Sequence, residues 1–167
     1  MKIYYGRAIY DNKEISAVVR VLKRNSFNLI DGPSVKKLEE KIAKLFGKKY
    51  GLMVNSGSSA NLLALSSFNL KKGSEIITPS LTFSTTVSPL VQSGLIPLFI
   101  DVEKETMQMN TSLLKEISLE GVSAICVPNL IGNVANWEEI YQFAKENNLK
   151  TIEDSADTIG YKYKTDK

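Results

Sequence analysis

The stretch YGLMVNSGSSANLLAL, residues 50–65, joins a short apolar segment to a run typical of a helix. Its first part, Tyr50–Val54, predicts a β-strand, and Ser59–Phe68 predicts the helix that follows. The small residues Gly57–Ser59 stand at the start of this helix, where several backbone N–H groups have no partner within the helix. Those N–H groups and the positive end of the helix dipole make this start a candidate site for a phosphate or another anion.

Serine and glycine before a helix are also ordinary capping residues, so the run alone leaves two interpretations open. It is not a P-loop, since no Gly-Lys-Ser/Thr follows, and the G-x-G-x-x-G fingerprint of dinucleotide sites is absent. The choice between simple capping and anion binding therefore depends on the rest of the chain.

Beyond this run, apolar segments predict strands and helices in strict alternation. The expected strands are Glu75–Thr78, Pro97–Val102, Ser123–Pro128 and Lys150–Asp154, and the expected helices are Ser84–Gln92, Ser112–Ser118 and Trp137–Glu146. Such alternation indicates an α/β fold, a three-layer sandwich whose mostly parallel sheet is covered by helices on both faces.

Two helices and a loop are predicted ahead of the sandwich. Asp11 and Glu14 make a capping-box-like pair for the first helix, and the second helix runs from Ser34 until Gly47 stops it. A loop, residues 25–32, separates them. We therefore divide the chain into a helical arm and loop, residues 1–33, and the sheet-containing part, residues 34–167.

Polar residues gather where the predicted strands end. Four such clusters are Ser56–Ser59, Pro79–Thr82, Asn129–Asn133 and Asp154–Asp157. In parallel sheets ligands bind beyond the carboxyl ends of the strands, so these clusters predict a site on one edge of the sheet. Any single polar loop has a simpler explanation, because every strand end needs one.

The last predicted strand ends in two consecutive acids, Glu153 and Asp154, which should face opposite sides of the sheet and so form no acid/base pair. A carboxylate at a strand end can bind a metal, act as a base or pair with a cation. One such cation is the protonated ring of pyridoxal phosphate. Phe83, just past another strand end, could stack on a flat cofactor, although core packing explains a phenylalanine equally well.

Composition narrows the classes of function. The chain of 167 residues has a net charge of +3 and no histidine. The small charge does not indicate nucleic-acid binding, and the lack of histidine excludes Ser-His-Asp and Cys-His catalysis and histidine metal sites within this chain. The single cysteine, Cys126, is expected in the core and fits a reducing cytoplasm. No secretory signal and no membrane-spanning stretch is visible, so no membrane partner is expected. No histidine or cysteine cluster supports a soft metal, so no metal is expected either.

Taken in order, five motifs resemble the DegT/StrS family of sugar-modifying enzymes that use pyridoxal phosphate. They are Asp31–Pro33, Asn55–Ala60, Ile77–Phe83, Pro97–Val102 and Ile152–Asp154. Each motif is weak alone, whereas their order and spacing over nearly the whole chain are specific. The resemblance implies part of a fold-type I aminotransferase large domain, with the active site at a homodimer interface.

The same resemblance implies cofactor contacts, residue by residue. Ser58 and Ser59 would hold the cofactor phosphate, and Phe83 would stack on the ring. Asp154 would bond the ring nitrogen, because a nearby negative charge keeps the pyridine protonated and the protonated ring withdraws electrons from the substrate. Pyridoxal 5′-phosphate or pyridoxamine 5′-phosphate is thus the expected cofactor.

By the same resemblance, Gly57 and Asp157 are further expected cofactor contacts, and Gly32 is an expected substrate contact.

Two details favour one branch of the family. Family aminotransferases usually carry Gln or His where this chain has Asp157, and Tyr-Gly-Gln where it has Ile131–Asn133. These differences favour the nucleotide-sugar 3-dehydrases of cell-surface polysaccharide and deoxysugar biosynthesis. Those enzymes use pyridoxamine phosphate to remove a hydroxyl from a nucleotide-linked 4-keto-6-deoxyhexose.

The residue that would choose between the two chemistries lies outside this sequence. In the family, the Schiff-base lysine, or the histidine that replaces it, comes after the segment that matches Asp154 and would lie beyond Lys167. The resemblance therefore predicts that the chain is the N-terminal part of a longer protein and is inactive alone. A sugar-nucleotide aminotransferase, a truncated fragment without activity and an unrelated α/β binding module remain as alternatives.

Overall fold

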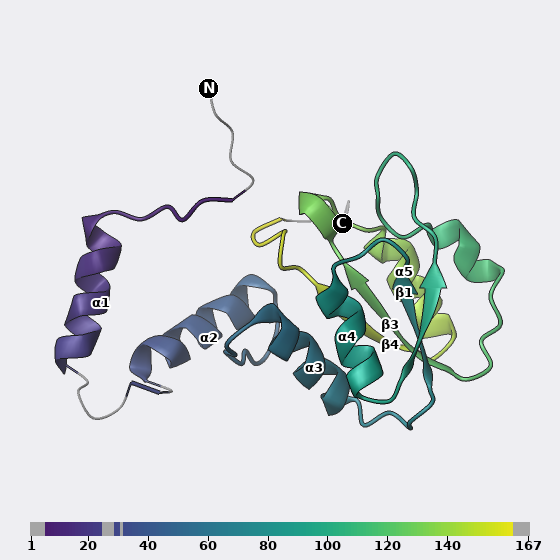
Figure 1. The fold of residues 1–167 in the computed structure, drawn as a ribbon, viewed down its shortest axis with the longest axis horizontal. Helices are drawn as coiled ribbons and strands as arrows, with labels where there is room; N and C mark the ends of the chain where they lie inside the picture. Colours follow the sequence, from purple (N-terminus) through teal and green to yellow (C-terminus); the bar gives the residue numbers. More distant parts are fainter. Residues whose placement is uncertain (1–5, 25–28, 31, 162–167) are drawn as a thin grey trace. The chain divides into compact units, whose positions relative to one another are not determined.

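The computed structural model describes residues 6–24, 29–30 and 32–161. The chain divides into two units, residues 1–53 and 54–167, and each is described by itself (Figure 1). The division at residue 33 that the sequence suggests stays a prediction.

The first unit contains helices α1, Asn12–Arg24, and α2, Pro33–Leu45. The predicted cap of α1 is confirmed: the Asp11 N–H donates to Glu14 Oε2 at 2.7 Å, and Asp11 Oδ1 accepts from the Lys13 N–H at 2.6 Å. Helix α2 begins with a proline, whose missing N–H costs nothing at that position. Gly47, with φ of +61°, ends it as expected.

The predicted strand Tyr50–Val54 is wrong, because these residues carry no strand in the structure. Their backbone runs against α2 instead. A Cβ atom on Gly51 would lie 2.5 Å from the Glu39 carbonyl oxygen, and the Met53 N–H donates to Glu39 Oε1 at 2.8 Å. The contacts to α2 come from the backbone of the segment, whereas the side chains of Tyr50, Leu52 and Met53 are exposed, so its apolar composition does not mark a strand here.

The second unit is the α/β sandwich that the sequence predicts. Its four strands are β1, Glu75–Pro79; β2, Ile96–Ile100; β3, Val122–Pro128; and β4, Lys150–Asp154. They form one sheet in the order β2-β1-β3-β4, and all three pairings are parallel. Each strand therefore ends at the same edge of the sheet.

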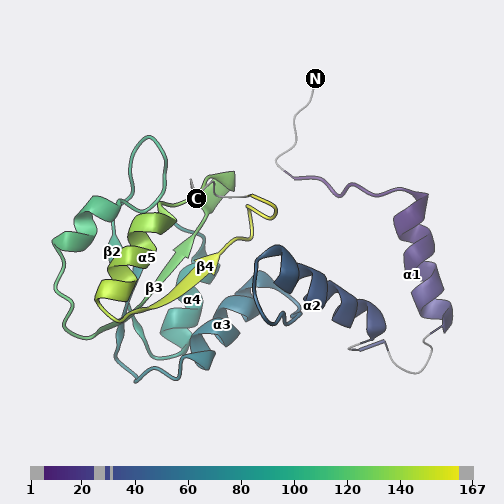
Figure 2. The ribbon, with the colours of Figure 1, turned by 180° about the vertical axis from the view of Figure 1, so that it is seen from behind.

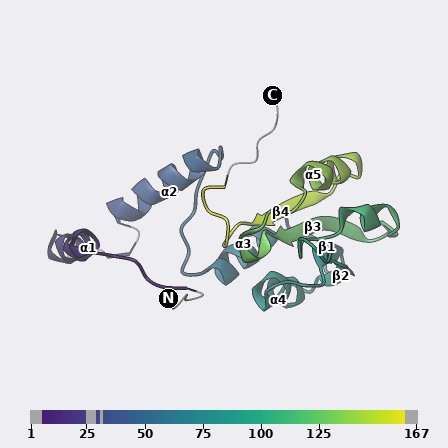
Figure 3. The same ribbon diagram turned by 90° about the horizontal axis from the view of Figure 1, so that it is seen from above.

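Three helices cover the two faces of this sheet. Helices α3, Gly57–Ser67, and α4, Ser84–Gln92, lie on one face, and α5, Trp137–Glu146, lies on the other. Figure 2 shows α5 on the near side of the strands, and Figure 3 shows the layers from above. The expected helix Ser112–Ser118 is instead a five-residue 3₁₀ helix, Thr111–Lys115, because the Asn110 side chain caps a tight turn at 3.1 Å from the Ser112 N–H. A second 3₁₀ turn, Leu130–Gly132, follows β3.

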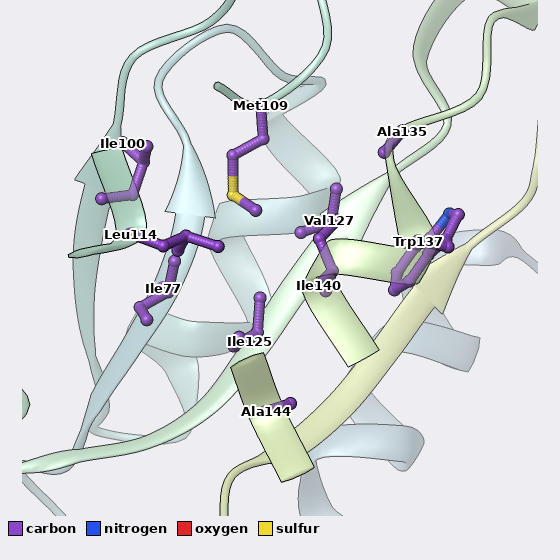
Figure 4. Close-up of a cluster of buried hydrophobic side chains, with 10 residues drawn as sticks. All are labelled: Ile77, Ile100, Met109, Leu114, Ile125, Val127, Ala135, Trp137, Ile140 and Ala144. Carbon is purple, nitrogen blue, oxygen red and sulfur yellow. The ribbon is translucent and has the colours of Figure 1, made fainter. Parts of the chain in front are cut away.

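The core follows the two-residue period of the strands. Neighbouring residues of β1 enter different clusters: Ile77 packs toward α5, and Ile76 packs toward α3 and α4. Figure 4 shows the α5-side cluster, in which Trp137 and Ile140 meet the strand residues. Cys126 is fully buried on the other face, as the sequence predicts. The buried core thus lies between the sheet and the helices on both faces, and polar residues gather at the edge where the strands end.

Candidate functional site

The carboxyl ends of β3 and β4 are tied together at the edge of the sheet. The Asn129 N–H, immediately after β3, donates to the Asp154 carbonyl at 2.9 Å. The polar clusters after β1, β3 and β4 therefore lie along one edge, because the three strands are parallel neighbours. The fourth cluster, Ser56–Ser59, opens α3 rather than following a strand.

The Asn61 side chain brings the start of α3 to that edge. Its Nδ2 donates to Asp154 Oδ2 at 2.8 Å and to the Thr85 carbonyl at 3.4 Å. Thr85 lies in the first turn of α4, and Asp154 ends β4. Three elements that are far apart in the sequence therefore meet around one buried amide.

The start of α3 shows the capping that its serines predict and leaves two backbone N–H groups free. Ser56 is the cap: its Oγ accepts from the Ser59 N–H at 3.2 Å. The N–H groups of Gly57 and Ser58 have no acceptor among the described residues. Capping by one serine thus leaves the N–H groups of the next two residues free at the positive end of the helix dipole, so anion binding there stays a prediction.

Phe83 and Asp154 lie in the two segments that the Asn61 amide contacts. Phe83 precedes α4 directly, two residues before the Thr85 carbonyl that Asn61 contacts. Its side chain is 66% exposed, so core packing does not account for it. The structure therefore gathers the elements that carry Ser58, Phe83 and Asp154 at one corner of the sandwich.

Asp157 has a different contact. Its Oδ2 accepts from the Ile131 N–H at 3.1 Å, in the turn after β3. Ile131 has φ of 54° and Gly132 has φ of 78°. A positive φ is strained for a β-branched residue, so the carboxylate holds an unfavourable turn in place. Gly32 lies in the first unit, where its carbonyl starts α2, and its substrate role stays a prediction.

Sequence reasoning did not single out Asn129, which organises the opposite side of the same edge. Its Nδ2 donates to Glu153 Oε1 at 2.9 Å and to Ser155 Oγ at 3.1 Å. Its Oδ1 accepts from the Trp137 Nε1–H at 2.8 Å and from the Ala135 N–H at 3.1 Å. The only signal in the sequence is a polar residue directly after a buried strand.

The two acids at the end of β4 each act on a neighbour. Burial, and then the Asp154 charge, raise the pKa of the Cys126 thiol to about 12. Burial, and then the charge of Glu153 and a hydrogen bond to it, raise the pKa of Tyr141. As predicted, the two carboxylates face opposite sides of the sheet, Asp154 toward α3 and Glu153 toward α5.

The residues at this corner fit pyridoxal phosphate in chemical terms. The free N–H groups of Gly57 and Ser58 suit its phosphate, the exposed Phe83 ring suits its flat face, and Asp154 is an acceptor for a protonated ring nitrogen. The hydroxyls of Thr82 and Thr86, on either side of Phe83, are buried without a hydrogen-bond partner in the described part of the chain. The corner is therefore richer in unused polar groups than a packed strand end requires.

The described part of the chain shows neither a metal cluster nor a membrane-spanning helix. In the described ranges, no group of three or more Cys, Asp or Glu side chains is placed to hold a metal ion. Of the helices in the described ranges, none combines the length and the apolar character needed to cross a membrane.

The fold and the sequence both match known proteins. Residues 8–167 match the model of the DegT/DnrJ/EryC1/StrS aminotransferase family. GDP-4-keto-6-deoxy-D-mannose 3-dehydratase of Yersinia pseudotuberculosis is 36% identical over 157 residues, which are 90% of this chain and 39% of that protein. dTDP-4-dehydro-2,6-dideoxy-D-glucose 3-dehydratase of Saccharopolyspora spinosa is 39% identical over 167 residues, covering 95% of this chain and 36% of that protein.

A solved structure gives the same result. The Escherichia coli GDP-4-keto-6-deoxy-D-mannose 3-dehydratase with bound hydrated pyridoxal phosphate is 36% identical and superposes with a TM-score of 0.86, over 94% of this chain and 41% of that one. The chain thus spans about two fifths of the length of these relatives. The resemblance that the sequence motifs indicated is confirmed, and the chain belongs to the DegT/DnrJ/EryC1/StrS aminotransferase family.

Proposed function

We propose that this chain supplies the phosphate and ring contacts of an enzyme that uses pyridoxal or pyridoxamine phosphate. The enzyme would remove the 3-hydroxyl of a nucleotide-linked 4-keto-6-deoxy sugar, in cell-surface polysaccharide or deoxysugar biosynthesis. The observation that carries the proposal is the Asn61 amide, which joins the starts of α3 and α4 to Asp154. The dehydratase relatives support the choice of reaction.

Each residue has a role that its environment supports. Gly57 and Ser58 would bind the phosphate through their N–H groups, and Ser59, beside the Ser56 cap, would add its hydroxyl. Phe83 would cover one face of the ring and exclude water from it. Asp154 would keep a proton on the ring nitrogen.

The cofactor, when bound, supplies an electron sink next to the reacting carbon of the sugar. Asp157 would act on the surroundings of the site, since it holds the turn at Ile131. Gly32 would contact the substrate.

A sugar-nucleotide aminotransferase is the second candidate, because the family that the chain matches is named for amino transfer. The turn Ile131–Asn133 and Asp157 favour dehydration, as the resemblance implies. We also propose a homodimer, which the exposed apolar side chains of α1, Ile15, Val18 and Leu22, support. A cytoplasmic location is in keeping with the single, buried and unpaired Cys126.

The test has two arms. Pyridoxal phosphate and pyridoxamine phosphate are titrated into the chain and into the full-length gene product, and binding is followed by absorbance and by ³¹P NMR. The gene product with bound pyridoxamine phosphate is then given a GDP-linked 4-keto-6-deoxyhexose, and the sugar is analysed by mass spectrometry. Loss of the 3-oxygen supports dehydration, a new nitrogen at C4 indicates amino transfer, and the absence of cofactor binding by the gene product contradicts the proposal.

A further inference from the structure

We infer that Asn61 is a positioning residue: its side-chain amide orients the Asp154 carboxylate toward the cofactor ring and ties it to the first turn of α4, which follows Phe83 directly. This inference rests on the proposed function. Asn61 lies early in α3 and is only 6% exposed. A buried amide of this kind needs hydrogen-bond partners, and it finds them across 93 residues of sequence at Asp154 and across 24 residues at Thr85.

The contacts of Asp154 fix its carboxylate at both oxygens. Oδ2 accepts from Asn61 Nδ2 at 2.8 Å, and Oδ1 accepts from the Ala156 N–H at 3.2 Å. An ionised carboxylate has about four acceptor positions. Two are occupied by these donors, so the group is held in one plane and can still receive a hydrogen bond from a ring N–H.

The chemical type of the donor matters as much as its position. Asn61 carries no charge, so it orients Asp154 without cancelling its negative charge, as a lysine or an arginine would. Cys126, whose thiol lies within range of that charge, is held neutral by its raised pKa and adds no second negative charge. The charge of Asp154 thus remains for the ring nitrogen.

The second N–H of the same amide reaches the start of α4. The planar amide holds its two N–H groups at a fixed angle, so the Thr85 carbonyl and Asp154 Oδ2 are set relative to each other. Phe83 is two residues before Thr85. The Asn61 side chain therefore links Asp154, which would bond the ring nitrogen, to the start of α4. Phe83, which would cover the ring face, directly precedes that helix.

The test uses Asn61→Leu, which keeps the approximate size and removes both donors, in the full-length gene product. Pyridoxamine phosphate labelled with ¹⁵N in the ring is the probe, because its chemical shift reports the proton on the ring nitrogen. We expect binding to weaken about tenfold. We also expect the bound ring to lose its proton at a lower pH than in the unchanged protein. In the Asp154→Asn background the same substitution should change neither quantity.

Asn147→Leu is the matched control. Asn147 also donates a part-buried amide hydrogen bond, to the Phe143 carbonyl at 2.8 Å, at the end of α5 and away from Asp154. A general loss of stability would affect both variants, whereas the change in ring protonation should follow Asn61→Leu alone. Chemical denaturation of each variant shows that the comparison is made between folded proteins.

A second measurement needs no substitution at Asn61. In the cofactor-free chain, the two side-chain N–H resonances of Asn61 should move when Asp154 is changed to Asn, and those of Asn147 should stay. Unmoved Asn61 resonances overturn the inference even if Asn61→Leu fails to fold. Unaltered affinity and ring protonation in a folded Asn61→Leu protein also overturn it and leave the proposed function intact. An unchanged gene product that binds no pyridoxamine phosphate removes both.

Discussion

Two carboxylates stand side by side at the end of β4, and their surroundings differ. Asp154 faces α3 and α4, where two donors hold it and acceptor positions stay free. Glu153 faces α5, where Asn129, Ser155 and Tyr141 donate to it at 2.9, 2.7 and 3.5 Å. The pleat of one strand thus separates an acid that remains available to a ligand from an acid committed to the fold.

The two buried asparagines beside these acids repeat the contrast. Asn129 uses both halves of its amide within the protein: it donates to the Glu153 side and accepts from Ala135 and Trp137. The amide of Asn61 is instead directed at the one acid with spare capacity. Polar groups of the same kind therefore hold a loop together on one face and prepare a site on the other.

The largest effect should come from exchanging the two acids for their amides. Asp154→Asn removes the charge that keeps the ring protonated, and we expect the turnover of the full-length enzyme to fall at least about 100-fold. Glu153→Gln is the control on the same strand and should leave turnover within about threefold, because Glu153 faces α5. Steady-state kinetics on nucleotide sugar measures both. Equal losses for the two variants would contradict the assignment of one face to the cofactor.

Asn129→Ala should give the largest loss of stability on the other face. It leaves the buried Trp137 Nε1–H and the Ala135 N–H without their acceptor, and we expect a loss of about 2 kcal/mol in the free energy of unfolding. Urea denaturation followed by the fluorescence of the single tryptophan measures it. Asn133→Ala, on an exposed residue of the same loop, is the control and should cost less than about 0.5 kcal/mol. Similar costs for the two variants would mean that the network contributes little.

Alkaline pH should distinguish the two faces, because the buried Cys126 thiol lies on one and the partly exposed Tyr141 hydroxyl on the other. In the folded chain the pKa of Cys126 is raised from 9.0 to about 12, so its neutral form is favoured and its contribution to stability is complete below pH 9. The contribution is lost as the pH rises toward 12, and about 1 kcal/mol should be gone by pH 10.

Cys126→Ala should remove that part of the pH dependence. Tyr141→Phe should remove the part of the pH dependence of stability that begins above pH 10, because the pKa of Tyr141 is raised from 10.0. Urea denaturation between pH 8 and pH 10.5 measures both. An unchanged slope between pH 9 and pH 10 in Cys126→Ala would contradict the origin of the effect.

The local parts of this architecture could be predicted from the sequence. The bounds of α4, α5 and β4 agree with the expected segments residue for residue, because periodicity and capping residues such as Asn136 are encoded nearby. The strand predicted for Tyr50–Val54 is wrong because strand formation depends on distant residues. An apolar run becomes a strand only beside a partner strand, and here the close backbone contact is with Glu39. Pattern alone does not say which surface an apolar segment will cover.

The candidate site also has a part that could be predicted from the sequence and a part that could not. Polar clusters at strand ends and the alternation of Glu153 and Asp154 follow from the period of a strand, so the edge of the sheet could be predicted. The Asn61 contact joins residues 93 positions apart, and the four bonds of Asn129 depend on the turn after β3. No periodicity carries such information, since it arises only when the layers pack.

The smallest effect, about 1 kcal/mol, compares the caps of the helices on the two faces. Ser56 Oγ accepts from the Ser59 N–H at 3.2 Å in α3, and Asn136 Oδ1 accepts from the Glu139 N–H at 3.4 Å in α5. Alanine at either position should lower the free energy of unfolding by about 1 kcal/mol, because one N–H at the helix start loses its acceptor. Stability alone would therefore not separate them.

Cofactor affinity should separate the two caps. Ser56→Ala also loosens the turn that presents the N–H groups of Gly57 and Ser58, so pyridoxal phosphate should bind about three- to fivefold more weakly, whereas Asn136→Ala should bind it as the unchanged protein does. Urea denaturation and ³¹P NMR titration of the same two variants give both quantities. If both caps weakened cofactor binding equally, the phosphate would not be held by the start of α3, and the difference between the two faces would have to rest on Asp154 alone.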